Sequence, residues 1–146
     1  MEDHILDAPS VDAKVNYAGF WIRFAAYFID AVILFVVNLG LSFVLFTDYS
    51  AFAPNMASQG LSLVLGIAYF CAMESSGRQA TLGKMAVGIK VGNSLGEQIT
   101  FTNALGRYFA KILSGLILLI GFMMAGWDPK KQALHDKLAK TYVFYA

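Results

Sequence analysis

The chain has 146 residues, of which 58% are hydrophobic and only 14% are charged. A soluble domain is typically about 45–50% apolar and about a quarter charged, so this composition excludes an ordinary water-soluble protein. The net charge of +1 excludes a strongly basic surface, and we expect no nucleic-acid partner. A single cysteine, Cys71, excludes an intrachain disulfide and a cysteine-based zinc site. The sequence therefore predicts a small integral membrane protein whose main partner is the lipid bilayer.

Residues 1–16 are expected to form a short acidic tail, and residues 17–146 a single transmembrane domain. A secretory signal begins with positively charged residues, whereas the charged residues of this tail are mostly acidic. We therefore expect no cleavable signal. Its acidic residues are Glu2, Asp3, Asp7 and Asp12. The histidine of the tail, His4, has no ligand cluster beside it, and we expect neither a metal nor a cofactor.

Three apolar stretches have the length, or nearly the length, of a membrane-spanning helix. The first covers residues 18–46 and the second residues 56–75. At about 1.5 Å per residue, each reaches the roughly 30 Å of a bilayer's hydrocarbon core. The third, residues 112–126, reaches that length only if residues 105–111 are included, with their cations directed outward. The expected fold is an all-α membrane protein with three apolar helical regions.

The distribution of lysine and arginine predicts the orientation in the membrane. Residues 47–59 contain neither, whereas five follow the second stretch: Arg78, Lys84, Lys90, Arg107 and Lys111. The positive-inside rule places this first loop outside and the N-terminus in the cytoplasm, in a cell (inner or plasma) membrane. The C-terminal segment is also basic, yet three complete spans would put it outside. The third region is therefore either a simple span or a re-entrant pair that turns near residues 114–115 or 120–121.

Short strands are expected on the cytoplasmic side. Residues 87–91 and 98–101 flank a glycine-bearing turn and predict a β-hairpin. Residues 141–145 are β-branched or aromatic and also favour a strand. A third strand would stabilise an otherwise marginal hairpin, and it would place the tail on the same side of the membrane.

Several blocks, in their order and spacing, resemble the RDD family of membrane proteins. They are the Phe-Trp-Ile-Arg block at residues 20–23, the Thr-Leu-Gly-Lys block within residues 81–91, Arg107, and the His-Asp-Lys block within residues 132–143. The family name denotes one arginine and two aspartates, which correspond here to Arg23, Asp30 and Asp136. The resemblance implies a multi-pass membrane protein, with transport of an unidentified ligand or cation/proton exchange as the expected activity.

Two of the three named residues lie on one helix. Arg23 and Asp30 are two helical turns apart, so they share a face and are separated by about 10.5 Å along the axis. Tyr27 lies between them, where its hydroxyl could bridge the pair. A charge in the middle of a spanning helix costs about 2.5–3.5 kcal/mol unless it is compensated. Two interpretations follow. The two residues form a site for a proton or an ion, or they are structural charges that hold the spans together.

Asp30 needs a proton or a cation as its partner. Arg107 and Lys111 are the candidates within the chain, because they lie four residues apart on one helical face. A transported monovalent cation or proton is the candidate from outside it.

Arg23 in turn needs an acid. Asp136 or Asp128 could supply one if the tail is cytoplasmic, and Glu74 at the end of the second stretch is a rival. His135, next to Asp136, is either a pH switch or a hydrogen-bonding surface residue.

Two function classes follow. A transporter or cation/proton exchanger would have to be a homo-oligomer, because so short a chain cannot enclose a transport path alone. The alternative is a non-transport scaffold or assembly module whose intramembrane charges are structural. No nucleophile–base set occurs in a credible context, so we do not expect an enzyme or catalytic residues.

Overall fold

The computed structural model describes residues 16–45, 56–116 and 120–146. The predicted tail, except Asn16, and most of the predicted outer loop lie outside this part of the chain. The helices are α1 (Phe20–Leu45), α2 (Met56–Glu74), α3 (Leu82–Ala86), α4 (Phe101–Leu116), α5 (Ile120–Met123), the 3₁₀ helix η2 (Met124–Gly126) and α6 (Leu134–Ala139). The strands are β1 (Ile89–Gly92) and β2 (Tyr142–Tyr145). The predicted fold class, mostly helical with a small sheet, is confirmed.

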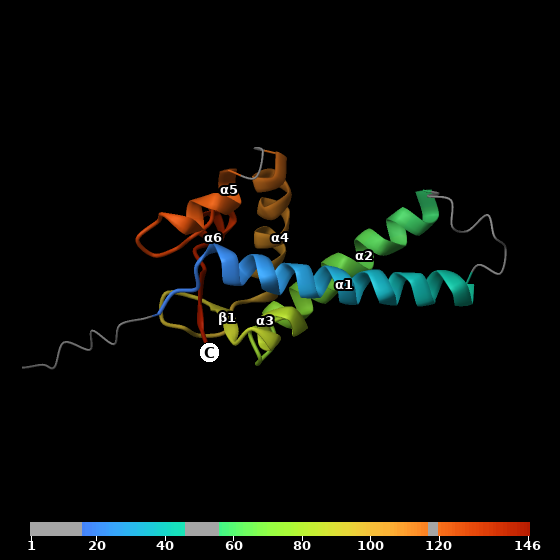
Figure 1. Cartoon of the computed structure of the whole chain (residues 1–146), viewed down its shortest axis with the longest axis horizontal. Helices are drawn as coiled ribbons and strands as arrows, with labels where there is room; N and C mark the ends of the chain where they lie inside the picture. Colours follow the sequence, from blue (N-terminus) through green and yellow to red (C-terminus); the bar gives the residue numbers. More distant parts are fainter. Residues whose placement is uncertain (1–15, 46–55, 117–119) are drawn as a thin grey trace, which may run out of the picture.

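Two helices, α1 and α2, are long and apolar enough to cross a membrane. After Asp30, α1 carries no ionisable side chain, and its aromatic residues face outward: Phe28, Phe35 and Phe43 are 62%, 68% and 75% exposed. An exposed apolar surface along a helix of this length is typical of a helix that faces lipid. Figure 1 shows both helices extending to one side of the molecule, beyond the other elements.

The third apolar region is bent. The axis of α4 and that of the segment 120–126 differ by 114°, and the two count as a third span only if taken together. A close approach holds the bent arrangement, because a Cβ on Gly121 would lie 2.9 Å from the Cβ of Ser114 and 3.1 Å from that of Leu134. Glycine therefore lets α5 pack tightly against α4 and α6. This geometry matches the turned-back alternative better than a straight helix.

The sheet contains the chain's C-terminal residues. β1 pairs antiparallel with β2, with Ile89 opposite Tyr145 and Gly92 opposite Tyr142. The prediction that residues 98–101 form the second strand of a hairpin is wrong. The side chain of Asn93 closes the turn by accepting bonds from the backbone N–H groups of residues 95 and 97, and Thr100 then caps α4 through the N–H of Asn103, at 3.2 Å.

A small apolar core lies where the sheet meets the helices. Its buried side chains are mostly small: Ala18, Ala26, Cys71, Ile89, Val91, Ile99, Ala104 and Val143. Figure 1 shows β1, α3 and α6 near the beginning of α1, with the C-terminus beside them. The polar side chains of the predicted site lie at this end of the molecule.

Candidate functional site

Arg23, in the first turn of α1, has a partner for each guanidinium nitrogen. Its Nε donates to the carbonyl of Ala18 at 2.9 Å, its Nη2 donates to the carbonyl of Lys131 at 2.5 Å, and its Nη1 forms an ion pair with Asp136. The arginine thus joins α1 to the loop before α6 and to α6 itself. Of the three acids considered for Arg23, the structure pairs it with Asp136. Asp128 binds Lys137 at 2.5 Å instead, and Glu74 binds other cations.

Asp136 receives a second arginine from α4. Nε and Nη2 of Arg107 lie 2.9 and 2.7 Å from its Oδ1, and its Oδ2 also accepts the backbone N–H of Ala133 at 3.2 Å. Burial alone would raise the pKa of the Asp136 carboxyl, but Arg107 and Arg23 hold that pKa well below its usual range. The residue is therefore a buried carboxylate held between two guanidinium groups.

Glu74, the last residue of α2, is the other buried acid of this region. Its Oε2 accepts Nη1 of Arg107 at 2.8 Å, and its Oε1 lies 3.2 Å from Nζ of Lys111 and also contacts Nζ of Lys84. The Glu74 side chain is 2% exposed. Three cations from α3 and α4 therefore surround a single carboxylate.

Together these residues form what we call the buried ion-pair network. Its members are Arg23, Glu74, Lys84, Arg107, Lys111 and Asp136. The network is continuous, since Arg107 binds both acids, and it connects α1, α2, α3, α4 and α6. It contains four cations but only two carboxylates, and so carries an excess of positive charge if all members are ionised.

The excess of positive charge in the network affects the pKa of Lys84. Burial lowers the pKa of its ammonium to about 7; contact with Glu74 opposes this shift, and the nearby Arg107 and Lys111 add to it. The Lys84 side chain is 10% exposed. Lys84 is thus a group of the network that can gain or lose a proton near neutral pH.

Asp30 lies outside this network. Its Oδ2 accepts the hydroxyl of Thr81 at 2.5 Å, and its Oδ1 accepts the hydroxyl of Tyr69 at 2.7 Å and the backbone N–H of Gly83 at 2.8 Å. The same Thr81 caps α3 by accepting the N–H of Lys84 at 3.3 Å. Asp30 therefore anchors the start of α3 to the middle of α1.

Gly83 makes this anchor possible. A Cβ there would lie 2.1 Å from the carbonyl oxygen of Ala26 and 2.8 Å from Cγ of Asp30. Only glycine allows the backbone of α3 to approach α1 this closely. The Thr-Leu-Gly-Lys block is thus explained by geometry: Thr81 and Gly83 bind Asp30, and Lys84 binds Glu74.

The predicted partners of Asp30 are not those in the structure. Arg107 and Lys111 bind Glu74 rather than Asp30. Tyr27 is 54% exposed, and its ring stacks on Phe70 with centroids 6.2 Å apart. The tyrosine hydroxyl that reaches Asp30 comes instead from α2, from Tyr69, and a second hydroxyl comes from Thr81.

His135 is not the surface residue we considered. It is 4% exposed, its ring lies 4.9 Å from that of Phe122, and its Nε2 is 3.4 Å from Oδ1 of Asp136. Burial lowers the pKa of His135 to about 3, so the imidazole is neutral at physiological pH. This does not support a switch that acts near neutral pH.

The described residues contain no group of three His, Cys, Asp or Glu side chains that could hold a metal ion. Sequence reasoning missed four members of the site: Tyr69, Thr81, Gly83 and Lys84. The last three lie in the Thr-Leu-Gly-Lys block and could have been chosen on that signal. Tyr69 carries no such signal, because it is one aromatic residue among many in an apolar helix.

Comparison with known proteins finds one matching family and several similar proteins. The chain matches the RDD family over residues 17–140. It is 38% identical to the uncharacterized protein YxaI of Bacillus subtilis, over 88% of this chain and 97% of that protein. It is 33% identical to the uncharacterized membrane protein YteJ of the same organism, over 88% of this chain and 81% of that one. No solved structure matches it. The chain is therefore a membrane protein that belongs to the RDD family.

Proposed function

We propose that this RDD protein is a membrane-embedded structural module, a scaffold or assembly partner, in which the intramembrane charges hold the helices in one arrangement. The observation that carries the proposal is the continuity of the buried ion-pair network. Arg107 binds Glu74 of α2 and Asp136 of α6, and Asp136 also binds Arg23 of α1. Each contact joins elements distant in sequence.

The second support is the environment of Asp30. Three donors from α2, α3 and the residue before α3 bind its carboxyl group, which is 1% exposed. A transport site would need an accessible coordination position, and here the hydrogen-bonding capacity is directed at the protein itself. In low-dielectric surroundings such contacts fix one geometry, because each alternative leaves a polar group unpaired.

The orientation and assembly of the module belong to the same proposal. The pairing of β1 with β2 favours a common side of the membrane for both, and the basic residues around them favour the cytoplasm. On that basis we also place the start of α1 on the cytoplasmic side, because Tyr17 and Ala18, which precede this helix, pair with Phe144 and Val143 of β2. The outward-facing aromatic side chains of α1 provide surfaces for lipid and for further copies of the chain, and we propose a homo-oligomer.

A double-mutant cycle tests the structural role. Arg23→Gln and Asp136→Asn are made singly and together, and thermal unfolding is followed in detergent. Breaking a buried pair by removing one partner costs about 3–5 kcal/mol. We expect the double variant to be more stable than the sum of the two single losses predicts, because the two changes remove one shared interaction. If the stability loss of the double variant equals the sum of the two single losses, the proposed ion-pair network is contradicted.

A flux assay separates this proposal from transport. Purified protein in proteoliposomes is compared with empty vesicles under an imposed pH gradient and monovalent-cation gradients. We expect no protein-dependent flux. Saturable flux that Asp30→Asn abolishes, while the melting temperature stays unchanged, would overturn the structural proposal.

Cation/proton exchange is the second candidate, and one observation favours it. Lys84 shares the carboxylate of Glu74 with Arg107 and Lys111, and its pKa is near 7. If the protein exchanges protons, Lys84→Met should abolish pH-dependent flux. Lys90→Met is the matched control, because Lys90 lies over the ring of Phe144 in β2, away from the network.

A further inference from the structure

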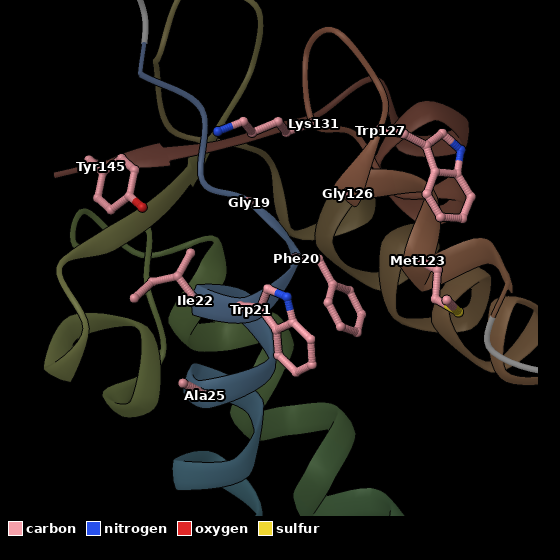
Figure 2. Close-up of a pocket in the computed structure, with 10 residues that line it drawn as sticks. All are labelled: Gly19, Phe20, Trp21, Ile22, Ala25, Met123, Gly126, Trp127, Lys131 and Tyr145. Carbon is pink, nitrogen blue, oxygen red and sulfur yellow. The ribbon is translucent and has the colours of Figure 1, made fainter.

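A cleft of about 700 Å³ lies between the beginning of α1 and η2 with the loop that follows it. Its walls are mostly aromatic or apolar and include Phe20, Trp21, Ala25, Met123 and Trp127. In Figure 2, Phe20 of α1 lies between Trp21 and Met123, and Trp127 lies above Met123 on the opposite side of the cleft from α1. The buried ion-pair network does not account for this feature.

The cleft is continuous with a lipid-facing surface. Trp21, Phe24 and Phe28 are 78%, 54% and 62% exposed, and their spacing places them along one face of α1. Trp127, across the cleft, is 68% exposed. Exposed tryptophans at the end of a spanning helix are typical of the interface between hydrocarbon and headgroups. The cleft therefore opens at the depth where phospholipids have their glycerol and phosphate groups.

One end of the cleft is positive. Lys131 lines it, and its Nζ lies over Gly19, 4.0 Å from where a Cβ of that glycine would be. Figure 2 shows Lys131 and Tyr145 on the side away from Met123 and Trp127. Within the part of the chain that the structure describes, the Lys131 ammonium has no carboxylate within 4.0 Å. An ammonium without an acid, next to an apolar wall, complements an anionic headgroup joined to an acyl chain.

We propose that this cleft binds a phospholipid with an anionic headgroup, the phosphate on Lys131 and an acyl chain against the aromatic wall of α1. A small soluble anion would not need the apolar wall that continues along α1 into the hydrocarbon. A zwitterionic lipid would satisfy the apolar wall but leave the ammonium less well neutralised. The site is independent of the structural role proposed above, since it uses none of the network's side chains.

The chain provides its own probe, because both of its tryptophans line the cleft. The full protein is reconstituted in phosphatidylcholine vesicles, and tryptophan quenching is titrated with brominated phosphatidylglycerol or brominated phosphatidylcholine. We expect the anionic lipid to bind about five-fold more tightly than phosphatidylcholine. This factor corresponds to about 1 kcal/mol, the contribution of one lysine at an anionic surface. Equal quenching by the two lipids would overturn the proposal.

Matched variants separate a defined site from diffuse attraction. Lys131→Gln should abolish the preference and Lys131→Arg should keep it. Lys130→Gln should also keep it, because Lys130 lies over the ring of Tyr142 and does not line the cleft. Ala25→Leu, which adds volume to the apolar wall, should weaken quenching by the anionic lipid without changing charge. An equal loss in Lys130→Gln and Lys131→Gln would mean general surface electrostatics and would contradict the site. Melting temperatures verify that each variant is folded.

Discussion

Arg23 and Asp136 are 113 positions apart in the sequence and form an ion pair in which the aspartate side chain is fully buried. This contact brings the C-terminal segment to the first turn of α1, and Arg107 extends it to α4. A helix end with buried charge is stable only when each charge is paired. The arginine and the second aspartate of the family name thus form one unit, and the first aspartate forms another with α3.

The first prediction compares two aspartates of the same segment. Asp136→Asn leaves Arg23 and Arg107 facing a neutral amide, and should lower the free energy of unfolding by about 3–5 kcal/mol. Asp128→Asn removes a more exposed pair with Lys137 and should cost less than about 1 kcal/mol. Thermal unfolding in one detergent measures both. Similar losses in the two variants would show that burial of the Asp136 pair does not matter.

The second prediction concerns the contact between α3 and α1. Gly83→Ala places a methyl group against the carbonyl of Ala26, which cannot move without distorting α1, and should destabilise the fold by about 1–3 kcal/mol or more. Gly106→Ala in α4 is the control, because nothing lies within 4 Å of its Cβ position. There the substitution should stabilise the helix by about 0.5–1 kcal/mol. A tolerated Gly83→Ala would mean that Asp30 does not fix α3.

Much of the fold could be predicted because it depends on composition and periodicity. Uninterrupted apolar runs predicted α1 and α2, and the β-branched and aromatic residues at 141–145 predicted β2. The charges available near the tail limited the partner of Arg23 to a few acids, of which Asp136 is the one in the structure. These features need only local patterns and the requirement that buried charges be paired.

The partners of Asp30 could not be predicted in the same way. Its bonds come from a hydroxyl of Tyr69, a hydroxyl of Thr81 and a backbone N–H, and none of these groups carries a charge that a sequence pattern would reveal. The hairpin prediction failed for a related reason. Residues 98–101 have strand-like composition, but the cap that Thr100 provides for α4 outweighs that local preference.

The third prediction concerns orientation. In a Cys71→Ala background, Lys90→Cys and Lys140→Cys should react with a membrane-impermeant thiol reagent only in inverted vesicles, because β1 and the end of α6 share one side. Ser50→Cys, at a position between α1 and α2 in the sequence, should react only in intact cells. Labelling of Lys90→Cys and Lys140→Cys from opposite sides would contradict a common cytoplasmic side.

The fourth prediction uses His135. Its pKa is about 3 in the folded protein against 6.5 for an unperturbed histidine, so the unfolded chain binds more protons between these values. Stability should therefore fall as the pH is lowered from 6.5 towards 3. His135→Leu keeps an apolar contact with Phe122 and should reduce this acid sensitivity, measured as melting temperature against pH. An unchanged pH profile in the variant would mean that His135 is not neutral in the fold.

The last prediction uses Lys84, whose pKa is also lowered in the folded protein, but over a higher pH range than that of His135. Its pKa is lowered from 10.5 to about 7, mainly by burial, so the unfolded chain again binds more protons between these values. Stability should rise as the pH is raised from 7 to 10. In this range the folded protein holds a neutral amine and the unfolded chain an ammonium, so unfolding takes up a proton and becomes less favourable as protons become scarcer. Lys84→Met should flatten this rise and be tolerated, because Glu74 keeps Arg107 and Lys111 as partners. Lys90→Met should leave the rise intact. A native profile that is flat over this range would show that Lys84 remains charged, and would remove the observation that favours cation/proton exchange.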